Sequence, residues 1–237
     1  ARVVKRASGF YLILTFQADI DMPNVPITGH VVGVDVGLQY FLSTSDGLEV
    51  VRPQFFVDMQ RELKLLQRRL KRKEVWSNNW RKMQQKVARL HERISNTRKD
   101  FHFKTAHRLC DVGETIAVEQ LNLIGLSRGF LGKHMLDAGH GQFMNQILPW
   151  VCFKRGVSYQ KVDARGTSQE CPDCGASVGK VLKDRWHECD NCGSSKPRDI
   201  ASAQVIRNRA VGRTVQQNAC GDGLAGVGVT TNLAKSR

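Results

Sequence analysis

The stretch "HVVGVDVGLQY", His30 to Tyr40, places the carboxylate of Asp35 in an otherwise apolar and glycine-rich run. Residues 31–35 predict a continuous apolar strand that ends in Asp35. The segments "QYFLST", "SDG" and "LEVVRP" follow directly and are typical of a β-hairpin. A strand that carries a carboxylate at its end indicates that the acid has a use there.

Composition favours a nucleic-acid partner. The chain has 237 residues, 41% of them hydrophobic, which suits one large domain or a core domain with an insertion. Lys and Arg number 36 against 22 Asp and Glu, a net charge of +14, and the pI is near 9.8. Such an excess is typical of proteins that bind polyanions, and the alternative is a merely soluble basic protein.

The chain shows no sign of a membrane protein. No apolar run reaches the length of a membrane span. The apolar patch over residues 9–18 predicts a strand and not a signal peptide. Because the first residue is Ala1 and not methionine, we expect a processed or truncated piece.

Much of the positive charge lies in one helical segment. Apolar residues recur at steps of three and four over residues 59–70 and again over 80–94, which predicts two long helices joined as a hairpin over 58–110. Between Asp58 and Arg108 there are 16 Lys and Arg against 5 Asp and Glu, a net charge of +11.

The rest of the chain alternates strands and helices. The segment "ETIAVEQLNL" predicts an apolar strand ending in Glu119. We expect a glycine-rich mobile loop over 124–135, followed by a helix over 136–155 that Pro149 kinks. A strand over 156–163, a further helix over 197–209 and a disordered tail over 212–237 complete the chain. In the kinked helix Phe143, Ile147, Val151 and Lys154 are spaced for one face. The order predicts an α/β fold with a mixed sheet.

The seven cysteines include two C-x-x-C pairs. Cys171 and Cys174 are followed, after 14 residues, by Cys189 and Cys192. Four thiolates at this spacing suit a closed tetrahedral zinc site, with an iron–sulfur cluster or two disulfides as alternatives. Paired C-x-x-C motifs and an odd total favour a reducing cytoplasm.

The other cysteines and one histidine of this region receive plainer interpretations. We interpret Cys110, Cys152 and Cys220 as ordinary buried or tail thiols. His187 is interpreted as a surface or backbone-bonding residue, and not as a fifth metal ligand.

Three acids stand at the ends of predicted elements. Asp35 and Glu119 each close an apolar strand, and Asp199 opens a helix. If adjacent strands bring them together, they repel one another unless cations lie between them, and oxygen ligands select Mg²⁺ or Mn²⁺. Two such ions roughly 4 Å apart activate water and stabilise the leaving oxygen of a phosphodiester. Alternatively, Asp35 orients the hairpin turn, Glu119 faces solvent at a strand end, and Asp199 only caps a helix.

The glycines around Asp35 leave a second chemistry open. In Gly33-x-Asp35-x-Gly37 the small residues would let a phosphate approach the backbone, whether a scissile phosphate or that of a nucleotide. The same pattern opens actin-like ATPases, so an ATPase is a rival hypothesis.

In their order, these motifs resemble the TnpB family, the RNA-guided nucleases of bacterial insertion sequences. The resemblance covers residues from about 30 to 210, and it implies a RuvC-like, RNase H-type fold with an inserted basic hairpin and a four-cysteine zinc ribbon. It implies that residues 1–29 are the end of a wedge-like β region and a linker. The nuclease domain would then comprise residues 30–165 and 195–211, with the zinc ribbon over 166–194.

The resemblance also implies residue roles. Asp35, Glu119 and Asp199 match the three acids of a Mg²⁺-dependent site that cleaves DNA chosen by a guide RNA, and the four paired cysteines match the zinc ligands. The basic hairpin matches the region against the guide–target duplex, with a solvated coiled-coil face as the alternative. The candidate contacts are Arg61, Lys64, Arg68, Arg69, Arg72, Arg81, Lys82, Lys86 and Arg89.

Two departures from the family pattern keep an alternative open. Ala201 stands where the family usually has asparagine, and only about 20 residues resemble the end of the N-terminal recognition region. The alternative is a targeting module that binds nucleic acid without cutting it, with a missing N-terminal portion or another subunit. For either function we expect guide RNA and target DNA as partners and the bacterial cytoplasm as the compartment.

Overall fold

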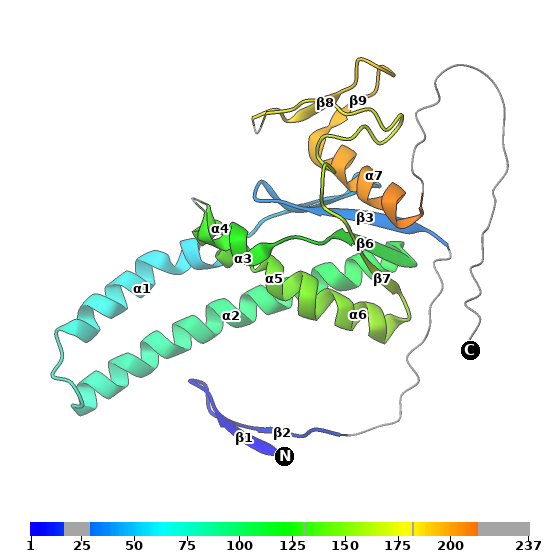
Figure 1. The fold of residues 1–237 in the computed structure, drawn as a ribbon. Helices are drawn as coiled ribbons and strands as arrows, with labels where there is room; N and C mark the ends of the chain where they lie inside the picture. Colours follow the sequence, from blue (N-terminus) through cyan, green and yellow to red (C-terminus); the bar gives the residue numbers. More distant parts are fainter. Residues whose placement is uncertain (17–28, 130, 182, 213–237) are drawn as a thin grey trace, which may run out of the picture.

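The computed structural model describes residues 1–16, 29–129, 131–181 and 183–212. Its centre is a five-stranded mixed sheet in the order β5-β4-β3-β6-β7 (Figure 1). The strands are β3 (Val31–Val36), β4 (Tyr40–Thr44), β5 (Glu49–Val51), β6 (Thr115–Glu119) and β7 (Ser158–Val162). The first three pair antiparallel, and β6 and β7 continue parallel to β3, so the predicted hairpin and the mixed sheet are confirmed.

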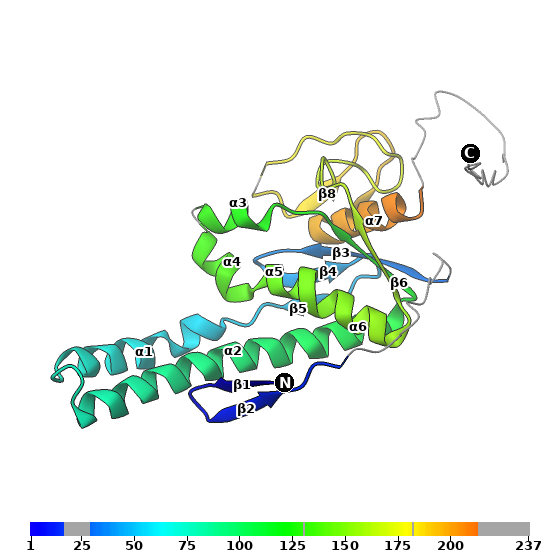
Figure 2. The same ribbon diagram turned by 60° about the horizontal axis from the view of Figure 1, so that its bottom comes forward.

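Alternation along the strands gives the sheet two buried faces (Figures 1 and 2). On one face Val32, Val34 and Ile116 pack against α2 (Asn78–Val112) and α6 (Leu148–Arg155). The sulfurs of Cys110 and Cys152 lie 3.6 Å apart in this core. Both cysteines are buried free thiols, as predicted. On the other face Val31 and Ala117 pack against α7 (Arg198–Ala210) through Ile206 and Ala210.

Two helices form the predicted hairpin, which extends beyond the sheet (Figure 2). They are α1 (Phe55–Lys71) and α2, and α1 begins three residues before the predicted start at 58. Buried Leu63 of α1 packs against Leu90 and Ile94 of α2. The Ser77 side chain caps α2 by accepting a hydrogen bond from the Trp80 N–H, 3.1 Å long.

The expected mobile loop over residues 124–135 is wrong, because most of this segment is helical. It contains α3 (Leu123–Arg128) and the start of α4 (Gly132–Ala138). The glycines had suggested a loop, but Gly132 serves close packing. A Cβ there would lie within 2.7 Å of the Ser127 carbonyl carbon, so only glycine lets α4 begin so near the end of α3.

The helix predicted over 136–155 is interrupted. Between α5 (His140–Gln142) and α6 lies a π-helical turn, Phe143–Ile147, and Pro149 occupies the first turn of α6. Proline lacks the N–H that would bond four residues back, so the helix widens just before it. Phe143, Ile147 and Val151 are buried together as predicted, whereas Lys154 is exposed.

A small hairpin lies along the outer side of α2. Its strands are β1 (Arg2–Lys5) and β2 (Phe10–Ile13), of which β2 falls in the strand predicted over 9–18. The Ser8 hydroxyl donates to Glu92 over 2.7 Å, which ties this hairpin to α2. The tail from 213 onward, with Cys220, and most of the predicted linker, 17–28, lie outside the described residues. None of the described helices combines the length and apolarity needed to cross a membrane.

Candidate active site and cysteine cluster

Strand register places two of the three acids side by side. The parallel pairing of β3 with β6 runs from Val31↔Thr115 to Val34↔Val118. The next residues along the two strands are Asp35 and Glu119, whose side chains belong to the face that α7 covers. The apolar strands therefore deliver both carboxylates to the same end of the sheet.

The third acid reaches this end because α7 lies very close to β3. A Cβ at Gly33 would lie 2.6 Å from the Arg207 backbone N and closer still to the Ala203 carbonyl O. Asp199, one helical turn before Ala203, is thereby set over the end of β3, in the first turn of α7. Gly33 thus makes room for a helix, which contradicts its interpretation as a position where a phosphate approaches the backbone and weakens the ATPase hypothesis.

The acids interact electrostatically. Burial, followed by the negative charges of Glu119 and Asp199, raises the pKa of Asp35 well above its ordinary value, while Arg198 and the Val36 backbone N–H oppose the rise. Burial also raises the pKa of Glu119, against a hydrogen bond from Thr167. A carboxyl whose charged form is disfavoured by burial and by like charges is one that a bound cation stabilises.

Two residues that the sequence reasoning missed hold Glu119. The Thr167 hydroxyl donates a hydrogen bond to the Glu119 carboxylate, which is only 8% exposed. Arg209 of α7 lowers the pKa of Glu119 and forms a 2.5 Å ion pair with Glu170. Thr167 stands in a loop and Arg209 in a basic helix end, so no sequence signal marked either of them.

The donor set suits a hard cation, although the acids are not drawn tightly together. Among the His, Cys, Asp and Glu side chains of the described residues, one group has all its ligand atoms within 4.8 Å of one another, and this group is the cysteine cluster. Carboxylate oxygens are the ligands that Mg²⁺ and Mn²⁺ prefer.

The four cysteines have the geometry of a tetrahedral metal site. The sulfurs of Cys171 and Cys192 are 3.7 Å apart, and those of Cys174 and Cys189 are 3.6 Å apart. Ligands about 2.3 Å from a tetrahedral zinc ion would be about 3.8 Å from one another, so the cluster could hold zinc.

Each cysteine pair forms the same tight turn. Gly175 and Gly193 follow the two pairs with φ of +75° and +71°, and their N–H groups donate to the carbonyls of Cys171 and Cys189. Glycine adopts this left-handed conformation without steric cost, which explains the Gly after each C-x-x-C.

The cysteine segment packs against α7. Strands β8 (Trp186–Glu188) and β9 (Ser195–Pro197) pair antiparallel, and β9 leads directly into α7. The buried Asn208 amide donates to the Pro172 carbonyl over 2.7 Å. The interpretation of His187 as a surface or backbone-bonding residue is wrong. It is fully buried, and neither ring nitrogen has a hydrogen-bond partner among the described residues.

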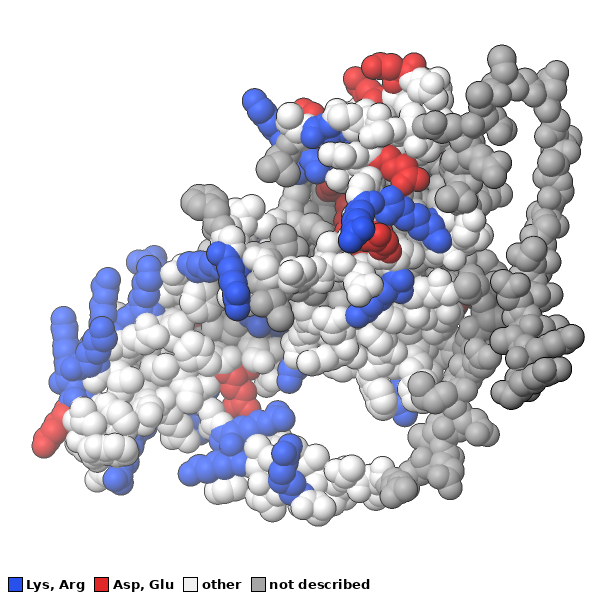
Figure 3. All heavy atoms as spheres, in the orientation of Figure 1, with Lys and Arg blue, Asp and Glu red and all other residues white. Residues whose placement is uncertain are grey.

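The helical hairpin presents its charge to solvent. In Figure 3 Lys and Arg side chains project along the edge that α1 forms. A hollow of about 520 Å³ on this helix is lined by Lys64, Gln67, Arg68, Leu70 and Lys71. All nine basic residues that the sequence singled out are exposed: Arg61, Lys64, Arg68, Arg69, Arg72, Arg81, Lys82, Lys86 and Arg89. Their positions are compatible with contact to a polyanion.

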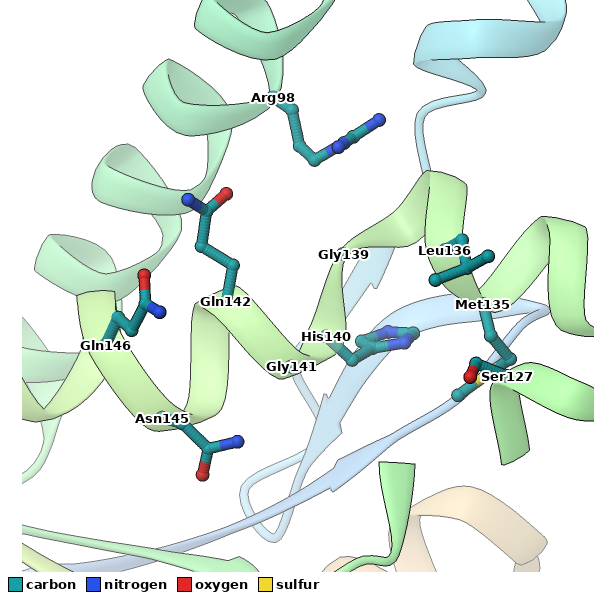
Figure 4. Close-up of a pocket in the computed structure, with 10 residues that line it drawn as sticks. All are labelled: Arg98, Ser127, Met135, Leu136, Gly139, His140, Gly141, Gln142, Asn145 and Gln146. Carbon is teal, nitrogen blue, oxygen red and sulfur yellow. The ribbon is translucent and has the colours of Figure 1, made fainter. Parts of the chain in front are cut away.

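A second hollow, of about 470 Å³, lies where α2, α3, α4 and the π-helical turn meet (Figure 4). Arg98 borders it from α2, and Gln142, Asn145 and Gln146 border it from α5 and the π-helical turn. None of the three acids lines this hollow, so it is separate from the acid cluster.

Comparison with family models divides the chain into two matched parts. The OrfB_IS605 model, described as "Probable transposase", matches residues 14–128, and the Cas12f1-like TNB domain model matches residues 140–206.

Individual relatives are similar over most of this chain. A "Putative RNA-guided DNA endonuclease" of Streptomyces pristinaespiralis is 31% identical over 202 residues, 84% of this chain and 49% of that protein. "Putative RNA-guided DNA endonuclease InsQ" of Escherichia coli K12 is 28% identical, over 90% of this chain and 56% of InsQ. "TnpB-like protein L79" of Acanthamoeba polyphaga mimivirus is 24% identical, over 55% of this chain and 26% of that protein. The chain spans about half the length of the first two relatives.

The fold is also found among solved structures. The cryo-EM structure of the Cas12f1–sgRNA–target DNA complex matches with a TM-score of 0.53 and 19% identity, over 88% of this chain and 55% of that one. At this identity the likeness concerns the fold alone.

Proposed function

The chain belongs to the TnpB family, and from this premise we propose that it is the nuclease portion of an RNA-guided DNA endonuclease. In this proposal the fold is RuvC-like, of the RNase H type. The nuclease domain comprises residues 30–165 and 195–211, with the ribbon over 166–194. The described β8–β9 pairing extends the ribbon sheet to Pro197.

One observation carries the proposal. Asp35, next to the last residue of β3, and Glu119, the last residue of β6, lie at adjacent positions, and the first turn of α7 carries Asp199 to the same end of the sheet. We assign these three carboxylates to Mg²⁺ or Mn²⁺, which would supply a metal-activated water and stabilise the leaving oxygen of a phosphodiester.

The protein's own groups position this chemistry. The Thr167 hydroxyl orients the Glu119 carboxylate, and the close contact of α7 with Gly33 sets the height of Asp199 above the sheet. Arg198 partly offsets the negative charge at Asp35. The cysteine segment, which we assign to structural zinc, supports α7 from its outer side through Asn208 and Pro172.

The basic hairpin is proposed to lie along nucleic acid. Its exposed Lys and Arg side chains would neutralise phosphates of a guide RNA and its target DNA without reading sequence. A further N-terminal portion or a partner subunit would supply the choice of target. Paired C-x-x-C motifs with free thiols suit the bacterial cytoplasm, the compartment that we propose.

Cleavage of end-labelled DNA tests the proposal. We expect the full chain, with the RNA that co-purifies with it, to cut single-stranded and R-loop DNA when Mg²⁺ is present. Asp35→Ala should abolish cutting while nucleic-acid binding survives. Asp100→Ala is the matched control, because Asp100 is exposed on α2 and pairs only with Lys104 among the described contacts. Retained Mg²⁺-dependent cleavage by Asp35→Ala would disprove the assignment.

A targeting module that binds without cutting is the second candidate. Ala201, where the family usually has asparagine, is buried on α7 two residues after Asp199 and offers no side-chain amide. Binding of the labelled R-loop by the wild-type chain with no detectable cleavage in Mg²⁺ or Mn²⁺ would favour this candidate.

A further inference from the structure

The tip of the helical hairpin carries an aromatic pair, an exposed Trp76 and a half-buried Trp80. Trp76 lies in the turn between α1 and α2 with 71% of its surface exposed. Its ring centroid is 5.3 Å from that of Trp80, in the first turn of α2, at an interplanar angle of 49°. The neighbouring Val75 is exposed as well, so the turn presents two apolar side chains to solvent.

Helix capping does not account for this arrangement. Trp76 directly precedes the Ser77 cap, where an apolar side chain commonly staples the helix start by burying itself. Here most of the indole faces solvent instead. Trp76 is also the one described non-glycine residue with positive φ, +70°, a conformation that bulky side chains rarely adopt.

Basic residues surround the pair on both sides. Arg72 and Lys73 precede it, Arg81 and Lys82 follow it, and all four are exposed. Exposed aromatic rings flanked by cations are the elements with which proteins hold nucleobases, because each base offers a π-face while its phosphate attracts the cations. A protein partner would leave the four cations without this match.

We propose that Trp76 and Trp80 form a stacking platform for a nucleobase with an open face. The inference rests on the proposed contact of the hairpin with nucleic acid and adds a specific site to it. The platform lies at the N-terminal end of α2, whose 35 residues, about 50 Å of helix, separate it from the turn that leads into β6. The open face belongs either to an unpaired nucleotide or to the last base pair of a duplex.

Fluorescence anisotropy with the full-length chain tests the platform. The probes are a labelled 20-mer as single-stranded RNA, as single-stranded DNA and as blunt duplexes. Trp76→Leu keeps an apolar residue in the turn, Trp76→Phe keeps a ring, and Trp150→Leu removes a tryptophan of α6 that is 50% exposed. Thermal melting of each variant verifies its fold.

We expect Trp76→Leu to weaken binding of at least one probe class about tenfold. Trp76→Phe should recover most of this loss, and Trp150→Leu should bind like the wild type. The salt dependence of Kd should not change, because no charge is removed. The probe class that responds identifies the source of the open base, single strand or duplex end.

Unchanged Kd values for Trp76→Leu with every probe would overturn the inference. So would self-association of the wild-type chain that Trp76→Leu abolishes at unchanged Kd, since the tip would then join two copies of the chain. Either result leaves the cleavage proposal standing, because that proposal is decided by Asp35→Ala.

Discussion

Gly33→Ala tests whether the close approach of α7 to the sheet builds the acid site. The added Cβ would lie 2.6 Å from the Arg207 backbone N, where ordinary contact begins at 3.4 Å. The two nearest obstacles, the Ala203 carbonyl O and the Arg207 N, are backbone atoms of α7, so no side-chain rotation relieves the clash. Helix α7 must therefore move outward by at least about 0.8 Å, and Asp199 moves with it away from Asp35.

The expected cost is larger for catalysis than for stability. Overpacking of a buried contact typically costs about 1–3 kcal/mol, and we expect the upper half of that range because backbone is displaced. The loss of chain entropy in the unfolded state offsets about 0.4–1 kcal/mol of it. Misplacing a catalytic group by about 1 Å lowers rates about 100-fold, so cleavage should fall further than stability.

Chemical denaturation and single-turnover cleavage measure the two effects. Gly179→Ala is the matched control, since nothing lies within 4 Å of the added Cβ and the φ of Gly179 lies outside the left-handed region that disfavours alanine. The reasoning is refuted if Gly33→Ala unfolds within about 0.5 kcal/mol of the wild type and cuts at the same rate.

Three further perturbations test other parts of the account. Cys189→Ser should reduce bound zinc from about one ion per chain to none, as measured by elemental analysis, and should lower Tm; a variant that keeps its zinc contradicts the site. Thr167→Val should slow single-turnover cleavage about tenfold without changing nucleic-acid affinity, because Glu119 loses its hydroxyl donor. Burial lowers the pKa of His102 and His140 to about 4, so both stay neutral while unfolded histidines protonate near pH 6.5. The free energy of unfolding should thus fall as the pH drops from 6.5 to 4, by about 3 kcal/mol per histidine. Denaturation curves of His102→Gln should show a smaller dependence of this free energy on pH.

The sheet and the long helices could be predicted because their patterns are local. Strand periodicity located β3, β4 and β6, and steps of three and four located α1 and α2. The same patterns placed Asp35 and Glu119 at strand ends. Their adjacency then followed from parallel pairing, which the structure confirms.

Glycines were the main source of error, because a glycine marks either a turn or a close approach. Gly132 had suggested a mobile loop, and Gly33 a phosphate site. In the structure each makes room for the backbone of a neighbouring segment, Ser127 for the first and α7 for the second. Only the tertiary arrangement distinguishes these uses.

The groups that support the acids could not be predicted either. Thr167 reaches Glu119 across 48 positions of sequence, and a threonine in a loop carries no pattern of its own. His187 is buried although both of its neighbours in the three-residue strand β8 are exposed, because the ribbon folds over it. Contacts between segments distant in the chain decide both cases.

Sulfur substitution at the scissile phosphate tests the central claim most directly, that Asp35, Glu119 and Asp199 hold the metal ions that act on this phosphate. Replacing a non-bridging oxygen by sulfur weakens the bond to Mg²⁺, and Mn²⁺ tolerates the softer ligand better. We expect the wild-type chain to cut the substituted DNA poorly in Mg²⁺ and to recover in Mn²⁺, with no recovery in Asp35→Asn. Equal cleavage of both DNAs in Mg²⁺, or Mn²⁺ recovery by Asp35→Asn, would contradict the account.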